Sequence, residues 1–149
     1  MPYAPRLPPF RATRRSNHML FHASIPADDP ERVARVLAEL WAGEVLPFPP
    51  FPEAFVVLAG DERRTLLDVY PRGREHAPAP REYVVRTNPA PSPHSEVHLA
   101  VGTLLTEESV LALGRREGWL TQRSDRGGLF VVIEFWVENK FSPVDSAPS

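Results

Sequence analysis

The chain contains no cysteine among its 149 residues, which excludes disulfides, thiolate metal ligands and a cysteine nucleophile. It has no apolar run near the ~20 residues that a membrane-spanning helix needs. Prolines and arginines stand where a signal peptide has its apolar core. Neither sign of charge dominates, because 17 basic residues face 19 acidic ones. We therefore expect a cytoplasmic protein that binds neither nucleic acid nor membranes and acts on small molecules or proteins.

Proline is plentiful, above all at the N-terminus. Residues 1–17 mix prolines with arginines, a composition that suits neither a helix nor a central strand. We predict a flexible arm there. Residues 18–145 are long enough for a single domain with a modest core.

An internal repeat at a spacing of about 76 residues organises this domain. Each copy opens with a histidine on an apolar run, continues into a capped helical segment that ends at a glycine, and closes with strand-like segments. Two copies are too few for a solenoid, so we interpret them as two half-modules of one domain. The matched landmarks are His22 with His98, Gly43 with Gly118, 55–58 with 130–133, and 67–68 with 144–145.

The first copy reads as strand, helix and hairpin. Residues 19–25 alternate like a strand, and Asp29 followed by Pro30 is a strong helix start. Apolar residues at three-and-four spacing then predict a helix that packs on a sheet and stops at Gly43. Residues 46–52 hold too many prolines for regular structure. The stretches 54–59 and 65–70 predict two strands around a glycine-containing turn, with Leu66, Asp68 and Tyr70 on one face.

Between the copies, residues 71–96 are rich in proline and charge and predict a linker with a possible short strand at 83–85. His76 and His94 fall in this stretch, and we expect both at the surface.

The second copy predicts a strand at 97–101 and a helix that Thr106 caps and Gly118 ends. Residues 129–137 form the most apolar run, typical of a strand buried on both faces. A short last strand is expected at 141–145.

Four stretches together carry a family resemblance: 22–29 (HASIPADD), 59–61 (AGD) with 67–71 (LDVYP), 96–98 (EVH) and 133–139 (IEFWVEN). They resemble the vicinal oxygen chelate superfamily, the glyoxalase and bleomycin-resistance type of fold. The likeness covers about residues 18–145, and it looks strongest to small single-domain members. It implies an α+β fold in which two βαβββ modules, 18–71 and 97–145 with the linker 72–96 between them, pair into a cupped, mostly antiparallel sheet.

The resemblance also implies a divalent metal in the cup, held by a histidine on the first strand of each module and a carboxylate on the last. Carried over to this chain, the ligands are His22, His98 and Asp68. In the last strand of the second module, family members have a glutamate where this chain reads FSPVD. The internal repeat offers Asp145 as the fourth ligand, because residues 144–145 match 67–68. Such ligands suit zinc, iron, manganese, nickel or cobalt.

Two functions follow as expectations. The first is a metal-dependent lyase, isomerase or dioxygenase that chelates a small oxygen-rich substrate, with Glu134 as the candidate for proton transfer. The second is a metal-free protein that binds or sequesters a small molecule, as in antibiotic resistance. A structural module whose site has decayed is a third reading. We expect a homodimer, because sheet edges need cover. The candidate pocket residues are Phe48, Phe51, Tyr70 and Trp136.

The same residues also have structural interpretations, which we keep open. A histidine on a half-buried strand is, taken singly, more often a hydrogen-bonded core residue than a ligand. Asp68 has Arg63, Arg64 and Arg72 as possible partners. For Glu134 we favour a structural ion pair or an edge position, since an unpaired charge in an apolar strand is costly.

Overall fold

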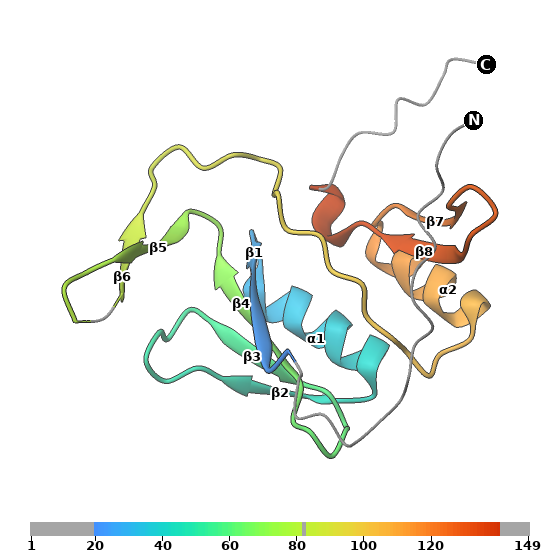
Figure 1. The fold of residues 1–149 in the computed structure, drawn as a ribbon, viewed down its shortest axis with the longest axis horizontal. Helices are drawn as coiled ribbons and strands as arrows, with labels where there is room; N and C mark the ends of the chain where they lie inside the picture. The colour runs from blue at the N-terminus through green and yellow to red at the C-terminus, as the bar shows by residue number, and fades with distance from the viewer. Residues whose placement is uncertain (1–19, 82, 141–149) are drawn as a thin grey trace, which may run out of the picture.

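A computed structural model describes residues 20–81 and 83–140 of the chain. The arm predicted at 1–17 and the strand predicted at 141–145 lie outside these residues. The described chain is α+β, with two helices and three separate sheets (Figure 1).

The first helix, α1 (Pro30–Trp41), forms as the sequence predicts. The Asp29 side chain accepts a hydrogen bond from the Arg32 amide at 3.1 Å, and Pro30 opens the first turn. The helix ends one residue earlier than expected, because Ala42 takes the left-handed conformation that closes it. Gly43 has another role, since a Cβ there would lie 1.9 Å from the carbonyl oxygen of Leu58.

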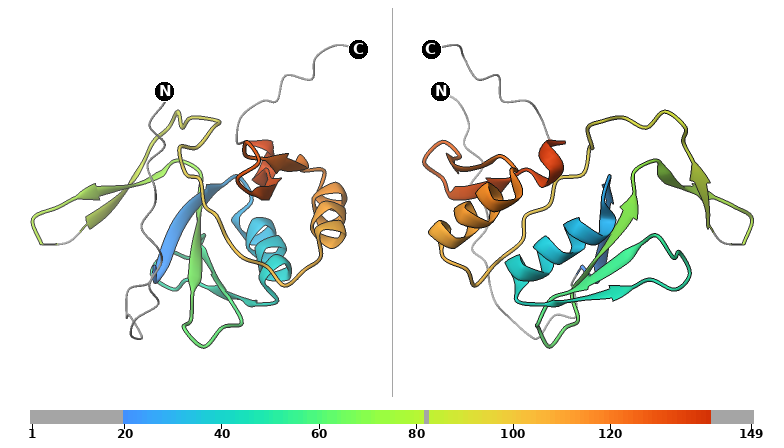
Figure 2. Two further views of the ribbon diagram at one scale, coloured as in Figure 1. Left: turned by 45° about the vertical axis from the view of Figure 1, so that its right-hand side comes forward. Right: turned by 180° about the vertical axis from the view of Figure 1, so that it is seen from behind.

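Four strands build the main sheet, and α1 covers one of its faces (Figure 2). The sheet order is β1-β4-β3-β2, with β1 parallel to β4 and the other pairs antiparallel. The predicted hairpin of 54–59 and 65–70 is confirmed as β3 and β4. The prediction of no regular structure from residue 46 was wrong, because β2 runs to Pro47 at the sheet edge, where a missing amide hydrogen is tolerated. The strands are β1 (His22–Ala27), β2 (Glu44–Pro47), β3 (Phe55–Leu58) and β4 (Leu66–Pro71).

A second hairpin fills part of the predicted linker. It consists of β5 (Arg74–Pro78) and β6 (Tyr83–Thr87), which pair antiparallel and project from the end of β4 (Figure 2). The short strand expected at 83–85 is therefore confirmed within β6, whereas β5 was missed because its five residues hold two charges, a histidine and a proline.

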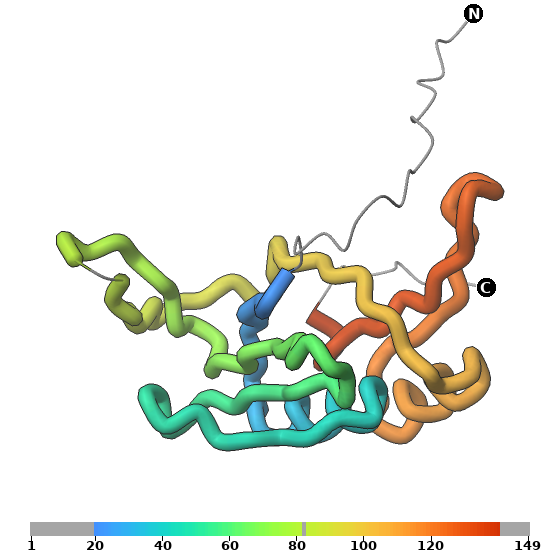
Figure 3. The backbone as a smooth tube through the Cα atoms, turned by 60° about the horizontal axis from the view of Figure 1, so that its bottom comes forward, coloured from blue at the N-terminus to red at the C-terminus, as the bar shows by residue number. Residues whose placement is uncertain are grey.

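The second half of the chain follows its predicted plan only in part. Its helix α2 (Glu107–Glu117) has the expected Thr106 cap, and Gly118 closes it in the left-handed conformation. Residues 97–101 form no strand, so that prediction was wrong. They belong to the irregular segment 88–106, which crosses from β6 to α2 and passes β1 on the way (Figure 3).

The last described elements are a hairpin and a turn of 3-10 helix. Strand β7 (Thr121–Asp125) pairs with β8 (Val131–Phe135), and η1 (Val137–Asn139) follows. The expectation that β8 is buried on both faces was wrong, because β8 has one partner strand and none of its residues is buried. An apolar run alone does not show how many layers will cover a strand.

One hydrophobic core joins the halves, with α1 between the main sheet and α2 (Figure 2). The buried stripe of α1 packs on the sheet, and residues of the second half join the same cluster. The central members are Ile25, Val33, Val36, Leu37, Leu40, Val57, Leu67, Val69, Val110, Leu113, Trp119 and Val137.

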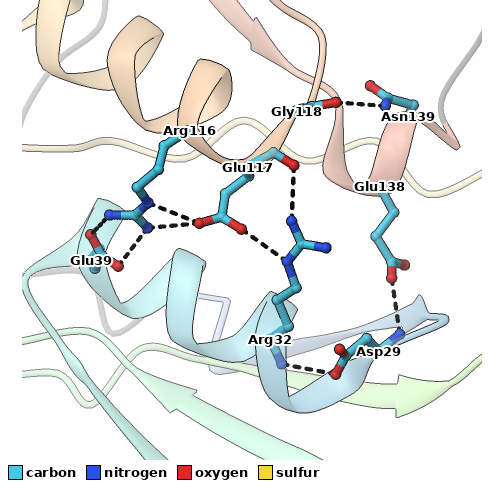
Figure 4. Close-up of polar contacts among 8 residues, drawn as sticks. All are labelled: Asp29, Arg32, Glu39, Arg116, Glu117, Gly118, Glu138 and Asn139. Carbon is cyan, nitrogen blue, oxygen red and sulfur yellow. Dashed lines mark hydrogen bonds and ion pairs between the residues drawn. The ribbon is translucent and has the colours of Figure 1, made fainter.

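Ion pairs reinforce the junction of α1 with the second half (Figure 4). Arg116 donates to both oxygens of Glu39 at 2.8 and 2.7 Å, and Arg32 donates to the Glu117 carboxylate at 2.9 Å. Burial by itself would raise the pKa of Glu117, but the hydrogen bonds from Arg116 and Arg32 outweigh it and hold the pKa below its usual value. Within the described ranges, no helix has the length and apolar character needed to cross a membrane.

Candidate functional site

The face of the main sheet opposite α1 carries the polar residues of both parallel strands. Side chains alternate along a strand, so the core positions Ile25 and Val69 force their neighbours to the other side. The register then pairs Ser24 with Asp68 and Pro26 with Tyr70. We call this surface, made by His22, Ser24, Asp68 and Tyr70, the open face, since neither described helix covers it (Figure 2).

Asp68 is the one charged residue in the described chain that is classed as buried, with 7% of its surface exposed. Its carboxylate lies 3.8 Å from Nε2 of His22 and accepts a long hydrogen bond of 3.4 Å from the Ser24 hydroxyl. Burial raises the pKa of Asp68 above its ordinary value, and the charge of His22 and the Ser24 hydrogen bond offset only part of this effect. A buried, weakly partnered carboxylate marks a candidate functional position.

The other partly buried carboxylates have cationic partners. Glu117 binds arginines 32 and 116, Glu138 faces Arg72 at 3.8 Å, and Glu134 binds Arg126 at 2.6 Å. No described arginine or lysine contacts Asp68; the arginines suggested for it from the sequence, 63, 64 and 72, are not its partners, and Arg72 binds Asp28 instead. Asp68 therefore differs from the partly buried glutamates of the described chain in having no arginine or lysine partner.

Aromatic rings gather next to Asp68 at one end of the open face. Tyr70 packs at centroid distances of 5.6 to 6.2 Å from Phe51 and Phe48. On its other side it meets the ring of His76 at 5.0 Å, and His76 in turn meets Tyr83 at 5.0 Å. Burial, the Asp68 charge and Tyr83 together raise the pKa of Tyr70 to about 12, so its hydroxyl stays protonated. We call these five residues the aromatic cluster.

Two cavities flank the open face. One, of about 280 Å³, is lined by Ser24, Tyr70 and His76 together with charged residues of β5 and the segment after β6. The other, of about 640 Å³, lies between the start of β1, the end of α1 and residues 99–104, and its walls are mostly apolar. His22 lines this larger cavity while its Nε2 faces Asp68. Asp68 itself lines neither cavity, but its two polar contacts do, Ser24 in the smaller and His22 in the larger. The larger cavity has the size of a ligand site.

The predicted metal ligands meet only in part. His22 and Asp68 lie side by side, as the sequence predicts. His98 is exposed in the irregular segment 88–106, and Asp145 lies outside the described residues. No group of three or more potential ligands forms within residues 20–81 and 83–140. The described donors do not by themselves make a metal centre.

Two other predicted site residues, Glu134 and Trp136, lie on β8 and directly after it, in the second half of the chain. Glu134 accepts hydrogen bonds from Gln122, Arg126 and Trp136, and these bonds, led by that of Gln122, hold its pKa below the usual value. This is the structural ion pair favoured from the sequence, and a lowered pKa makes the carboxylate a weaker base. Trp136 bonds to Glu134, whereas the predicted pocket residues Phe48, Phe51 and Tyr70 pack together elsewhere.

Sequence reasoning missed the two members of the aromatic cluster that come from the second hairpin, His76 and Tyr83. Both are exposed, as was expected for His76, yet their rings continue the series of ring contacts that begins at Tyr70, with His76 edge-on to Tyr70 and Tyr83 tilted against His76. The one available signal was the strand-like run at 83–85, which pointed to a hairpin partner upstream. Comparisons with protein families, with curated proteins and with solved structures found no match for the chain.

Proposed function

We propose that the protein binds a small organic molecule on the open face, as a metal-free binding or sequestering protein. The observation that carries this proposal is the buried Asp68 carboxylate, which has no arginine or lysine partner in the described chain and lies beside the aromatic cluster. Ligand sites combine an apolar, aromatic wall with a few polar groups that orient the ligand. The open face offers both.

The same proposal includes the finer architecture. The first half supports membership of the vicinal oxygen chelate type, because it runs β1, α1, β2, β3, β4 and places β1 parallel to β4. The second half supports duplication because each half has one helix with a side-chain cap at its start, Asp29 and Thr106, and a left-handed residue at its end, Ala42 and Gly118. On this reading, the two modules pair so that the open face lines the cup.

A screen of small molecules by thermal shift, followed by affinity measurements on two variants, tests the binding function. Phe51→Ala removes a ring of the aromatic cluster, and we expect about tenfold weaker binding of any hit, the value of one well-buried aromatic contact. Phe130→Ala is the matched control, because Phe130 is 59% exposed and precedes β8. Hits that bind Phe51→Ala and wild type equally would contradict the proposal, and so would a screen without hits.

A metal-dependent lyase, isomerase or oxygenase is the second candidate, favoured by the approach of His22 to Asp68. His22 and Asp68 would supply two of the metal ligands. His98 and Asp145 are the candidates for the others. The test is the metal content of the purified protein, after incubation with excess zinc, iron, manganese or nickel. Near-stoichiometric metal that is lost in both His22→Ala and His98→Ala would favour this candidate. Metal absent from the wild-type protein would rule it out.

A further inference from the structure

The proposed function does not say which chemical class of ligand binds. The environment of Asp68 indicates the charge of that ligand. Three partly buried glutamates of the described chain each meet an arginine. The Asp68 side chain, 10% exposed, instead has His22 and Ser24 as its polar contacts, and His76 acts on it electrostatically from farther away. An isolated buried carboxylate destabilises the fold unless a positive group compensates it. His22 compensates weakly, since its Nε2 is 3.8 Å away and its side chain is 58% exposed.

The rings next to Asp68 also favour a positively charged ligand. Aromatic faces attract organic cations, and more strongly where water is excluded. Tyr70 is buried, and Phe48, Phe51 and His76 surround its ring. Among residues 20–81 and 83–140, no arginine or lysine comes within bonding distance of the carboxylate, so none of these side chains stands where a cationic ligand would bind.

We propose, on the basis of the proposed function, that the ligand is a small organic cation with an aromatic group, whose positive charge pairs with Asp68. An ammonium or amidinium group would donate to the Asp68 carboxylate, and the attached ring would pack on the aromatic cluster. His22 moves aside as the ligand enters, which its exposed position on the first residue of β1 permits.

The test uses three probes of one shape on the full chain, with binding followed by NMR titration. The probes are 2-phenylethylammonium, its neutral analogue 2-phenylethanol and its anionic analogue 3-phenylpropanoate. We expect the cation to bind at least about tenfold more tightly than the neutral probe, the effect of one charge-assisted hydrogen bond, and the anion to bind more weakly than both. A neutral probe that binds as tightly as the cation would overturn the inference.

Two variants test whether the tighter binding of the cation depends on Asp68. Asp68→Asn keeps the size of the side chain and removes a buried charge, so it should fold, and it should lose about tenfold in affinity for the cation but not for the neutral probe. Glu62→Gln is the control, because it removes the same charge from the exposed β3–β4 turn and should change neither affinity. Equal binding of the cation to wild type and Asp68→Asn would overturn the inference.

The outcomes separate this inference from the proposed function. If neutral molecules bind at the open face and depend on Phe51 but not on Asp68, the charge assignment fails and the binding function stands. If none of the three probes binds, the charge assignment fails as well, and the thermal-shift screen with Phe51→Ala then decides the binding function by itself.

Discussion

The two halves of the chain share helix signals but differ in what surrounds their histidines. His22 opens a strand that pairs in register with β4, which fixes it near Asp68. His98, its counterpart in the sequence, lies exposed in a segment without secondary structure. Caps and glycines are local signals and recur in both halves, whereas a strand needs a neighbour to pair with. Repeated residues therefore do not guarantee repeated sites.

Alanine substitutions of the matched glycines, Gly43 and Gly118, should give the largest difference in stability between the halves. Gly43→Ala would place a Cβ 1.9 Å from the backbone oxygen of Leu58, so β2 must separate from β3. We expect a loss of about 3 kcal/mol in the free energy of unfolding. Gly118→Ala meets nothing within 4 Å and has only its left-handed φ of 72° against it, which costs about 1 kcal/mol. Urea denaturation of both variants checks this order, and equal losses would contradict it.

The second half depends on a side-chain contact with the first. Glu138 accepts hydrogen bonds from the amides of Asp28 and Asp29 at 2.7 and 2.9 Å and faces Arg72. Glu138→Ala should lower the free energy of unfolding by about 2 kcal/mol, because both amides and the arginine lose an acceptor. Glu108→Ala in the exposed first turn of α2 is the control and should change stability by less than about 0.5 kcal/mol. A Glu138→Ala variant as stable as the control would show that the core and the pairs Arg32–Glu117 and Arg116–Glu39 join the halves without this contact.

Asp68 should make stability depend on pH. Its pKa is raised in the folded state, so the folded protein binds the proton more tightly than the unfolded chain. The stabilisation is then present at low pH and is lost as pH rises from the ordinary aspartate value through the raised one. Asp68→Asn should remove this contribution and gain about 1 kcal/mol at neutral pH, where the wild-type carboxylate is charged. Denaturation curves between pH 3 and 7, about the range of carboxylate titration, measure it. A variant that is less stable than wild type at neutral pH would contradict the account.

The variants His22→Ala and His98→Ala should differ little in stability and clearly in their affinity for a ligand. Both are exposed, so His22→Ala and His98→Ala should each change the free energy of unfolding by less than about 0.5 kcal/mol. Affinity for a cationic open-face ligand should rise several-fold in His22→Ala alone, because His22 no longer competes with the ligand for Asp68. Titration of both variants with a cationic hit from the thermal-shift screen measures this difference, and equal changes in both would contradict it.

The sequence predicted local structure better than it predicted packing. Asp29, Pro30 and Thr106 specify helix starts within a few residues, and the alternation of β1 and β4 correctly placed Asp68 and Tyr70 on one face. The missing strand at 97–101 could not be foreseen, because pairing is a long-range property. The same holds for the exposure of β8 and for the edge contact of His76 with Tyr70.

The claim that the open face binds the ligand is tested most directly by mapping backbone amide shifts while a hit from the thermal-shift screen is added. We predict that the largest shifts fall on β1 and β4 around Ser24 and Asp68 and on the turn that holds Phe51. Strands β7 and β8 should shift little. Shifts centred on His98 or on β8, with none at Asp68, would contradict the account.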